Sequence, residues 1–294
     1  MRGRTATMPA GGGTLDAREE SAVVRFRGGF ALRGKRRDVL VRKLILDIPG
    51  ERLRGQIGSR KLTIATLARI DVAPDLFGAR IVVHTLRLSR RAALALNRAL
   101  GLNGVFAGGR SLGIISSVVQ PEAVTIASGT IALGGEESTF AKLESLGVEI
   151  GLWGTASRWG EGGPPVFLFE VASGTLGPDG LTGIVNGESG LTLQKTQPGQ
   201  DLLLLTPTVD LGSGVLSAGL TALSGENPAS GTIATLQTSA ATTRIRWATT
   251  MELTDVKAIT TQFLADRLNA TFAPPTPFTA GETLGKLNLL LYTG

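Results

Sequence analysis

Thr63-Ile64-Ala65-Thr66-Leu67 recurs without change later in the chain as Thr232-Ile233-Ala234-Thr235-Leu236. Other matches surround this pair in the same order, and the separation between partners grows slowly along the chain. They are residues 13–15 with 174–176, 29–32 with 190–193, 46–48 with 209–211, 88–89 with 253–254, and Asn97 with Asn269. An ordered series of this kind indicates two copies of one structural unit.

Short apolar or alternating runs, rich in β-branched residues, occupy most of both copies. The clearest are residues 23–26, 30–32, 39–48, 166–171, 190–193, 202–205 and 209–211. Turn signals such as Pro49-Gly50 and Asn186-Gly187 separate them. Strands of this length and spacing predict a mainly β chain of two tandem antiparallel repeats, each resembling a sandwich or a barrel.

Three helices are expected beside the strands. Ser89 is suited to cap a helix over residues 90–100. Thr254 is expected to cap a longer helix over residues 255–268, and a short helix is expected within 138–146. The first two helices come late in their repeats, so each repeat is predicted to be closed by one α-helix.

The two copies are unequal in length. Residues 125–170, with the short helix, precede Gly174 in the second copy, whereas only a dozen residues precede Gly13 in the first. We therefore expect a first repeat over residues 1–118 that lacks its opening strands and helix, and a complete second repeat over 119–294. An incomplete sheet exposes an edge, which the other repeat or a strand from a neighbouring chain is expected to cover.

The two predicted repeats also differ in net charge. Residues 1–118 hold 22 lysines and arginines against 8 acidic residues, whereas the remainder holds 8 against 16, so the net charges are +14 and −8. The densest basic cluster comprises Arg33, Lys35, Arg36, Arg37, Arg42 and Lys43. This cluster is either a solvated hairpin tip or a patch for an anionic envelope polymer. The absence of aromatic residues among these arginines argues against single-stranded nucleic acid as the partner.

Composition excludes several kinds of chemistry. The chain has no cysteine, so disulfides, thiolate metal sites and thiol catalysis are ruled out. His84 is its single histidine, which excludes a zinc site with several imidazoles, and we expect no metal site. Apolar runs are too short for a transmembrane helix, and residues 1–20 lack the apolar core of a signal peptide, so neither segment is expected.

Few side chains remain as candidates for binding. His84 lies in an alternating strand and is interpreted as a lone axial ligand, a general base or an ordinary surface histidine. Tyr292 is a strand aromatic suited to an edge or an interface. Trp153, Trp159 and Trp247 could stack on a planar or sugar ligand or pack at strand ends. No set of nucleophile, base and acid is apparent, so no catalytic residues and no enzymatic activity are predicted.

The order of motifs in the first copy resembles a known family. It runs from Gly-Gly-Thr-Leu-Asp (12–16) through Gly-Phe-Ala-Leu (29–32), Leu-Asp-Ile (46–48) and Thr-Ile-Ala-Thr-Leu (63–67) to the Leu-Ser-x-x-Ala helix and Leu-Gly of 88–113. This order is similar to the HtaA-type domain of actinobacterial surface and secreted proteins. Residues 140–148 resemble the linker helix of its tandem versions.

The resemblance implies a β-rich, non-enzymatic binding module at the cell surface or outside the cell, with haem or another apolar ligand. It further implies a tyrosine on the opening helix and a histidine after the 190–193 type of strand. This chain has Phe140 on that helix and no tyrosine, and the histidine positions fall near Lys35 and Thr196. The alternative is a structural surface protein whose basic and acidic halves pair head to tail, giving a homo-oligomer or filament.

Overall fold

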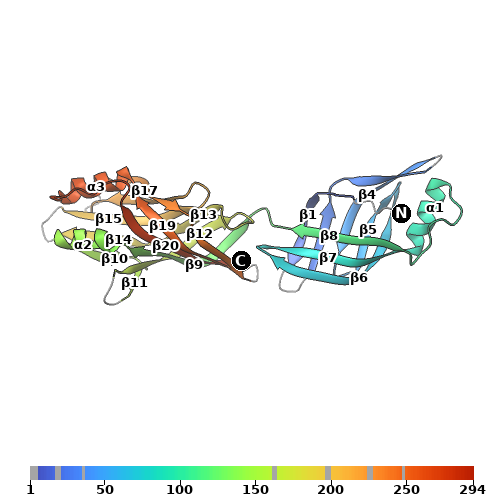
Figure 1. Ribbon diagram of the computed structural model, residues 1–294, viewed down its shortest axis with the longest axis horizontal. Coiled ribbons are helices and arrows are strands. Elements are labelled where there is room, and N and C mark those ends of the chain that lie inside the picture. The colour runs from blue at the N-terminus through green and yellow to red at the C-terminus, as the bar shows by residue number, and fades with distance from the viewer. Residues whose placement is uncertain are drawn as a thin grey trace. The chain divides into compact units, whose positions relative to one another are not determined.

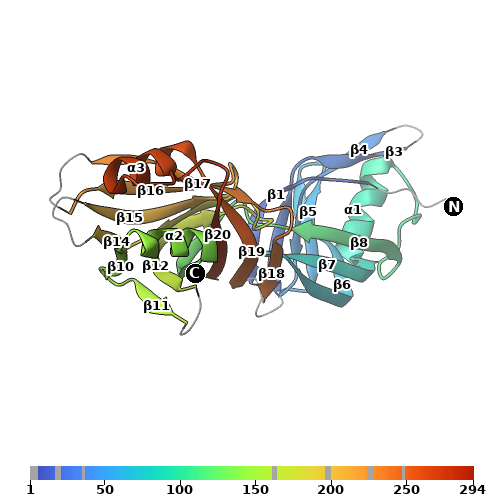
Figure 2. The same cartoon turned by 60° about the vertical axis from the view of Figure 1, so that its left-hand side comes forward.

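The protein is described by a computed structural model that covers residues 6–16, 21–34, 37–160, 164–195, 200–223, 228–246 and 249–294. Its chain forms two compact units, unit 1 over Met1–Gln120 and unit 2 over Pro121–Gly294. Figures 1 and 2 show that strands dominate both units. No helix among the described residues is long and apolar enough to cross a membrane.

Unit 1 is a single antiparallel sheet with a helix packed on it. Its strands are β1 (Ala10–Asp16), β2 (Ser21–Phe26), β3 (Gly29–Arg33), β4 (Asp38–Asp47), β5 (Arg52–Ile57), β6 (Arg60–Asp75), β7 (Gly78–Leu88) and β8 (Ser111–Val119). They follow the order β1-β2-β4-β5-β6-β7-β8, with β3 beside β4. The helix α1 (Arg90–Leu100) packs against β4, β5 and β6, at one end of the sheet in Figure 1.

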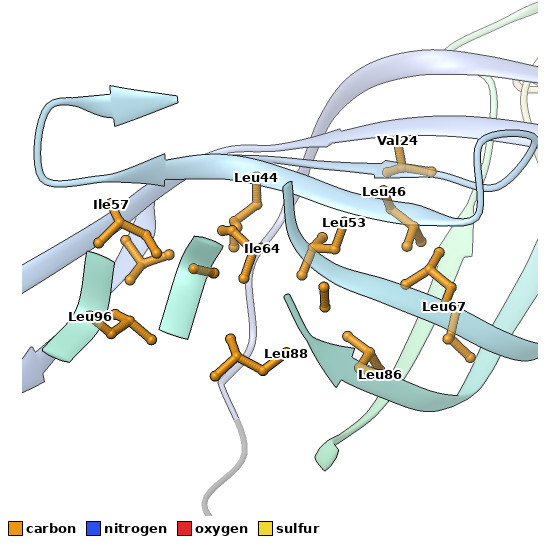
Figure 3. Packing of buried hydrophobic residues seen from close by; sticks show 14 of the residues in the cluster. Val24, Leu44, Leu46, Leu53, Ile57, Ile64, Leu67, Leu86, Leu88 and Leu96 are labelled. Atoms are coloured by element: carbon orange, nitrogen blue, oxygen red, sulfur yellow. The ribbon is translucent and has the colours of Figure 1, made fainter. Parts of the chain in front are cut away.

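The core of unit 1 follows from alternation along these strands. In β4, Val39 and Val41 are buried, and a bulge at Lys43 resets the alternation so that Leu44 and Leu46 are buried as well. Figure 3 shows these leucines meeting side chains from β5, β6, β7 and α1. Burial of such a contiguous aliphatic cluster is the main force that holds the sheet and the helix together.

Unit 2 contains a sheet that closes on itself. Its elements are β9 (Val124–Gly135), α2 (Glu137–Ser145), β10 (Val148–Trp153), β11 (Ser157–Trp159), β12 (Val166–Leu176), β13 (Gly183–Gly187), β14 (Gly190–Lys195), β15 (Asp201–Asp210), β16 (Val215–Thr221), β17 (Ala229–Gln237), β18 (Thr242–Arg246), β19 (Thr250–Thr260), α3 (Gln262–Phe272) and β20 (Thr283–Thr293). The path β15-β13-β12-β9-β20-β19-β17-β16 returns to β15 through a further pairing, which makes a ring of eight strands. The predicted mainly β fold of two antiparallel repeats, each closed by a helix, is confirmed.

Equivalent side chains make the same contacts in both units. Asn97 of α1 donates to the carbonyl oxygen of Phe106 (2.8 Å) and accepts from its N–H (2.9 Å). Asn269 of α3 does the same with Phe278, at 2.9 and 2.8 Å. The repeated Thr-Ile-Ala-Thr-Leu segments lie in β6 and β17 and show the same sequence of burial. The duplication therefore extends from the sequence to individual hydrogen bonds.

The expected helix over residues 255–268 was placed wrongly. Residues 250–260 form β19, and α3 begins at Gln262 with Thr261 as its cap. The hydroxyl of Thr261 accepts from the N–H of Leu264 and donates to a β17 carbonyl, as Ser89 accepts from Ala92 and donates to a β6 carbonyl. Ser89 therefore corresponds to Thr261 rather than to Thr254, at the same separation along the chain as Asn97 and Asn269.

Two smaller expectations also change. The runs 202–205 and 209–211 belong mainly to one strand, β15, which a bulge near Thr206 interrupts without ending. The short helix α2 begins at Glu137, one residue earlier than expected, and its cap residue Glu136 makes no side-chain cap hydrogen bond. Both differences lie at local irregularities that hide strand or helix periodicity in the sequence.

Candidate functional site

A hollow of about 720 Å³ opens in unit 2 beside α2. Figures 1 and 2 both show α2 next to β10, and β11 lies beyond them. The hollow is lined by Glu137, Phe140, Ala141, Leu143 and Glu144 of α2, by Val148, Glu149 and Ile150 of β10, and by Arg158, Pro164 and Pro165. Its volume lies within the range of small-molecule sites.

Phe140 is the aromatic residue of the lining, and its position depends on Gly135. The ring of Phe140 stacks on Phe167 of β12, with centroids 5.9 Å apart and planes inclined by 22°. Gly135, at the end of β9, lies so close that a Cβ atom there would meet the Phe140 ring at 1.7 Å. Glycine at this position therefore lets the Phe140 ring lie against the end of β9.

The helix that walls the hollow is fixed to the rest of unit 2 on its other side. The hydroxyl of Thr139 donates to the carbonyl oxygen of Thr283 at 2.9 Å. The ammonium of Lys142 donates to the carbonyl oxygen of Pro277 at 2.7 Å and lies 4.4 Å from the centroid of the Phe278 ring. These contacts tie α2 to the start of β20 and to the segment before it, so the wall of the hollow is anchored independently of any ligand.

The rim of the hollow is more acidic than basic. Glu137, Glu144 and Glu149 line it with exposed side chains, and Arg158 is the basic residue among the lining residues. The lining therefore holds three carboxylates and one guanidinium, which gives it a net negative charge. The floor beneath is apolar, and its buried residues are Leu143, Val148 and Pro165. The arrangement suits an apolar body that carries a positive charge.

His84 lies in the other unit, far along the chain from this hollow. Its Nε2 atom is 2.7 Å from the Oδ2 atom of Asp71 on the adjacent strand β6, and both side chains are exposed. Among the described residues, no hydroxyl nucleophile is hydrogen-bonded to His84, and no cluster of metal-ligating side chains occurs. The geometry is that of a surface histidine–carboxylate pair.

The structure distributes the remaining aromatic candidates over unit 2. Trp153 ends β10 opposite Gly190, and Trp159 ends β11, where it is 71% exposed. Neither tryptophan lines the hollow. Tyr292 is half exposed in β20, and Trp247 lies outside the described residues. The three described aromatics thus lie on three different strands, β10, β11 and β20.

The basic cluster of unit 1 is only partly described. Arg33 and Arg37 are exposed beside the turn between β3 and β4, and Arg42 and Lys43 are exposed at the bulge in β4. Lys35 and Arg36 lie outside the described residues, as does Thr196. The use of this cluster for an anionic polymer stays a prediction.

Asp47 and Asp210 occupy matching positions, as the repeat requires. Each carboxylate accepts a turn N–H three residues on, from Gly50 at 2.9 Å and from Ser213 at 3.0 Å. The hydrogen bonds at the second turn hold the pKa of Asp210 below its ordinary value. Both aspartates therefore act as local turn anchors.

Asp47 has additional partners that Asp210 lacks among its described contacts. Arg52 and Arg54 reach its Oδ2 atom at 3.0 and 2.8 Å. Burial raises the pKa of Asp47, but the hydrogen bonds from Arg52 and Gly50 and the two guanidinium charges outweigh it, so the pKa is lowered. The ionised carboxylate thus stabilises the β4–β5 turn of unit 1.

Sequence reasoning did not locate the hollow, although it singled out Phe140. The available signal was the Pro164-Pro165 pair that follows β11 together with an aromatic residue on a short helix. The lining residues come from three separate segments, and single-sequence periodicity does not show that α2 folds back onto β10. The site became visible only with the tertiary structure.

Fold and hollow together define the chain as a two-unit, mainly β protein with a helix-walled hollow in unit 2. No protein-family model matches the sequence, and none of the curated proteins compared with it is significantly similar. A similar solved structure is the C-terminal domain of HtaA from Corynebacterium glutamicum, with 18% identity, a TM-score of 0.44, and coverage of 58% of this chain and 99% of that one. Another is the haem-binding protein HtaB from the same organism, with 16% identity, a TM-score of 0.38, and coverage of 58% and 96%. The first bears the name of the family that the sequence motifs resemble.

Proposed function

We propose that this chain is a non-enzymatic binding module of the cell envelope or extracellular space, and that the hollow beside α2 takes its ligand. The observation that carries this proposal is the combination of an apolar floor, a stacked aromatic wall and a charged rim in one hollow of suitable volume. The proposed location rests on the motifs that resemble HtaA-type domains.

The charge of the rim sets the ligand class. Haem carries two carboxylates, which Glu137, Glu144 and Glu149 would repel and only Arg158 would attract. The helix offers Phe140 where the resemblance implies a tyrosine, and a phenyl ring has no oxygen to bind iron. A flat or elongated apolar molecule with a cationic group therefore fits the hollow better than an anionic porphyrin does.

Two porphyrins of opposite charge test this proposal on the full chain. Hemin and a tetracationic N-methylpyridyl porphyrin are titrated separately, and their Soret bands are followed. We expect saturable binding of the cationic porphyrin and weaker binding of hemin. Ala141→Trp fills the hollow and should weaken binding at least tenfold, whereas Ser138→Trp, on an exposed position of α2 outside the lining, should leave it unchanged.

The outcomes separate the parts of the proposal. Absence of binding of either porphyrin at about 0.1 mM, which corresponds to about 5.5 kcal/mol, contradicts a ligand site in the hollow. Equal binding to wild type and Ala141→Trp contradicts the assignment of the site. Tighter binding of hemin that Ala141→Trp abolishes keeps the site and refutes the charge argument.

A second function, assembly into a homo-oligomer or filament, is supported by the separation of charge. Residues 1–120 carry a net charge of +14 and residues 121–294 a net charge of −8, so contacts between unlike units of neighbouring copies are electrostatically favourable. Sedimentation velocity at about 10 mM and about 300 mM salt tests it, because screening weakens such contacts. A monomer at both salt concentrations removes this alternative.

A further inference from the structure

Unit 1 reproduces the closed ring of unit 2 with one strand missing. The matched residues place β1 with the end of β12, β4 with β15, and β6 with β17. Leu112-Gly113 matches Leu284-Gly285 at the same separation as Asn97 and Asn269, which places β8 with β20. In unit 2 the strand β9 lies between β12 and β20 and pairs with both. Among the described residues, unit 1 has no strand in the corresponding place, so β1 and β8 are the two borders of its sheet.

The directions of β1 and β8 determine which strand can pair with both of them. The seven strands on the path from β1 to β8 are joined by antiparallel pairings only. An odd number of such strands makes the two borders run in the same direction. The borders therefore cannot pair with each other in antiparallel fashion, and one strand of opposite direction fits between them, as β9 does in unit 2.

The border strand β8 lacks the charged residues and prolines that often protect an edge. The nine residues of β8, Ser-Leu-Gly-Ile-Ile-Ser-Ser-Val-Val, contain no charge and no proline. Leu112, Ile114 and Val118 are 47%, 69% and 50% exposed. Edge strands that remain solvent-exposed normally carry lysine, proline or inward-pointing charges. The composition of β8 is that of a strand with a partner.

The interior face of unit 1 is also incompletely covered. Ile115 and Leu15, which point toward the core from β8 and β1, are only partly buried. Their counterparts in unit 2, Leu287 and Leu176, are 0% and 1% exposed. The difference arises because β9 contributes inward side chains in unit 2, among them Ile131, and nothing in the described part of unit 1 replaces them.

We infer that unit 1 binds an extended peptide segment, which inserts between β1 and β8 and runs antiparallel to both. The segment is uncharged and carries aliphatic side chains at alternate positions in two short stretches, because β9 has Val124 and Ile126 and then Ile131 and Leu133 in the matching place. Every described strand already pairs with a neighbour along at least one edge. A strand of a folded second copy could therefore pair with β1 or with β8, but not with both. The occupant is therefore a segment without a sheet of its own.

A synthetic peptide with the β9 sequence, Val-Thr-Ile-Ala-Ser-Gly-Thr-Ile-Ala-Leu-Gly-Gly, tests the inference on the full chain. The peptide carries a fluorophore and a solubilising tail, and its anisotropy is measured as the chain is added. We expect saturable binding, which a peptide with proline at the position of Ile131 should lose, because proline removes a ladder hydrogen bond. Hydrogen exchange should slow in residues 111–119 when the peptide is bound.

Two substitutions in β8 provide a matched pair. Ser117→Lys places a charge on the inward, partly buried side of the border, whereas Ser116→Lys places the same charge on the exposed outward side. We expect at least tenfold weaker peptide binding for the first and no change for the second. Circular dichroism checks that both variants keep the fold.

Three results would overturn the inference. They are absence of binding to the folded wild-type chain, equal effects of the two lysine variants while both remain folded, and protection that appears in unit 2 instead of β8. The last result would mean that the peptide exchanges with β9 in the closed ring. The proposed porphyrin-binding site lies in unit 2, so failure of either proposal leaves the other unaffected.

Discussion

Asn97→Ala is expected to destabilise unit 1 by about 3 kcal/mol. The side chain of Asn97 is buried and makes two hydrogen bonds, of 2.8 and 2.9 Å, to the backbone of Phe106. Alanine leaves that N–H and that carbonyl without their partner, at about 1–3 kcal/mol for each buried group. The two groups together would cost about 2–6 kcal/mol. Phe106 is only half buried, so water recovers part of the loss, and the combined cost is expected in the lower half of this range, at about 3 kcal/mol.

The expected shift in melting temperature follows from the size of the unit. At about 2.1 cal/mol/K of unfolding entropy per residue, the roughly 120 residues of unit 1 give about 0.25 kcal/mol/K, so 3 kcal/mol lowers Tm by about 12 °C. All three tryptophans lie in unit 2, so their fluorescence reports that unit alone. Far-ultraviolet circular dichroism reports both units. Asn97→Ala should therefore lower the melting temperature of unit 1 that circular dichroism detects. The melting temperature detected by tryptophan fluorescence should not change.

Two control variants isolate the cause. Asn97→Asp keeps the acceptor for the Phe106 N–H but turns a carboxylate oxygen toward the Phe106 carbonyl oxygen, so it should not preserve stability at neutral pH. Asn103→Ala, at an exposed position in the following loop, should cost nothing measurable. Asn269→Ala should instead lower the fluorescence transition by a similar free energy, because its two hydrogen bonds, of 2.9 and 2.8 Å, match those of Asn97. A loss below about 1 kcal/mol for both alanine variants would refute the reasoning.

Three further outcomes are expected. The pKa of Asp47 is lowered in the folded state, so the ionised carboxylate stabilises the fold at pH values above its ordinary pKa of 3.8. This stabilisation is lost as the pH falls through the lower pKa of the folded state. Asp47→Asn should therefore make the melting temperature detected by dichroism less dependent on acid pH. Gly135→Ala forces the Phe140 ring aside, so it should weaken cationic-porphyrin binding and lower the fluorescence transition by about 1–3 kcal/mol. Ser89→Ala and Thr261→Ala remove equivalent helix caps, and each should cost about 1 kcal/mol, detected by dichroism for the first and by fluorescence for the second.

The sequence predicted the structure correctly where the signal lies within a few neighbouring residues. The Thr-Ile-Ala-Thr-Leu segments of β6 and β17 were matched correctly because they are identical in sequence, and both have a bulge at the isoleucine and the same order of burial. Ser89 and Gly101 predicted α1 because the serine accepts from Ala92 and the glycine adopts a left-handed conformation, with a φ of 67°. These signals act within a few residues, so a single sequence displays them.

The displaced helix shows where pattern reading failed. A bulge between Leu253 and Val256 places Asp255 at a φ of 62° and breaks the alternation of β19. The Thr254-Asp255 pair then has the appearance of a helix cap, although the N–H of Asp255 donates to the Asn288 side chain of the next strand. A bulge is stabilised by its partner strand, and the local sequence does not contain that information. The hollow beside α2 escaped prediction for the same reason, since its lining depends on distant packing.

The open border of unit 1 has a mechanical consequence as well. A ring of strands has no end from which it can be peeled, so pulling on unit 2 must break several hydrogen bonds at once. In the described part of unit 1, β8 pairs with β7 along one edge only, so the hydrogen bonds between these two strands can break one after another. A chain held at both termini under tension would therefore lengthen first through its first half, while the second half stays intact and bears the load.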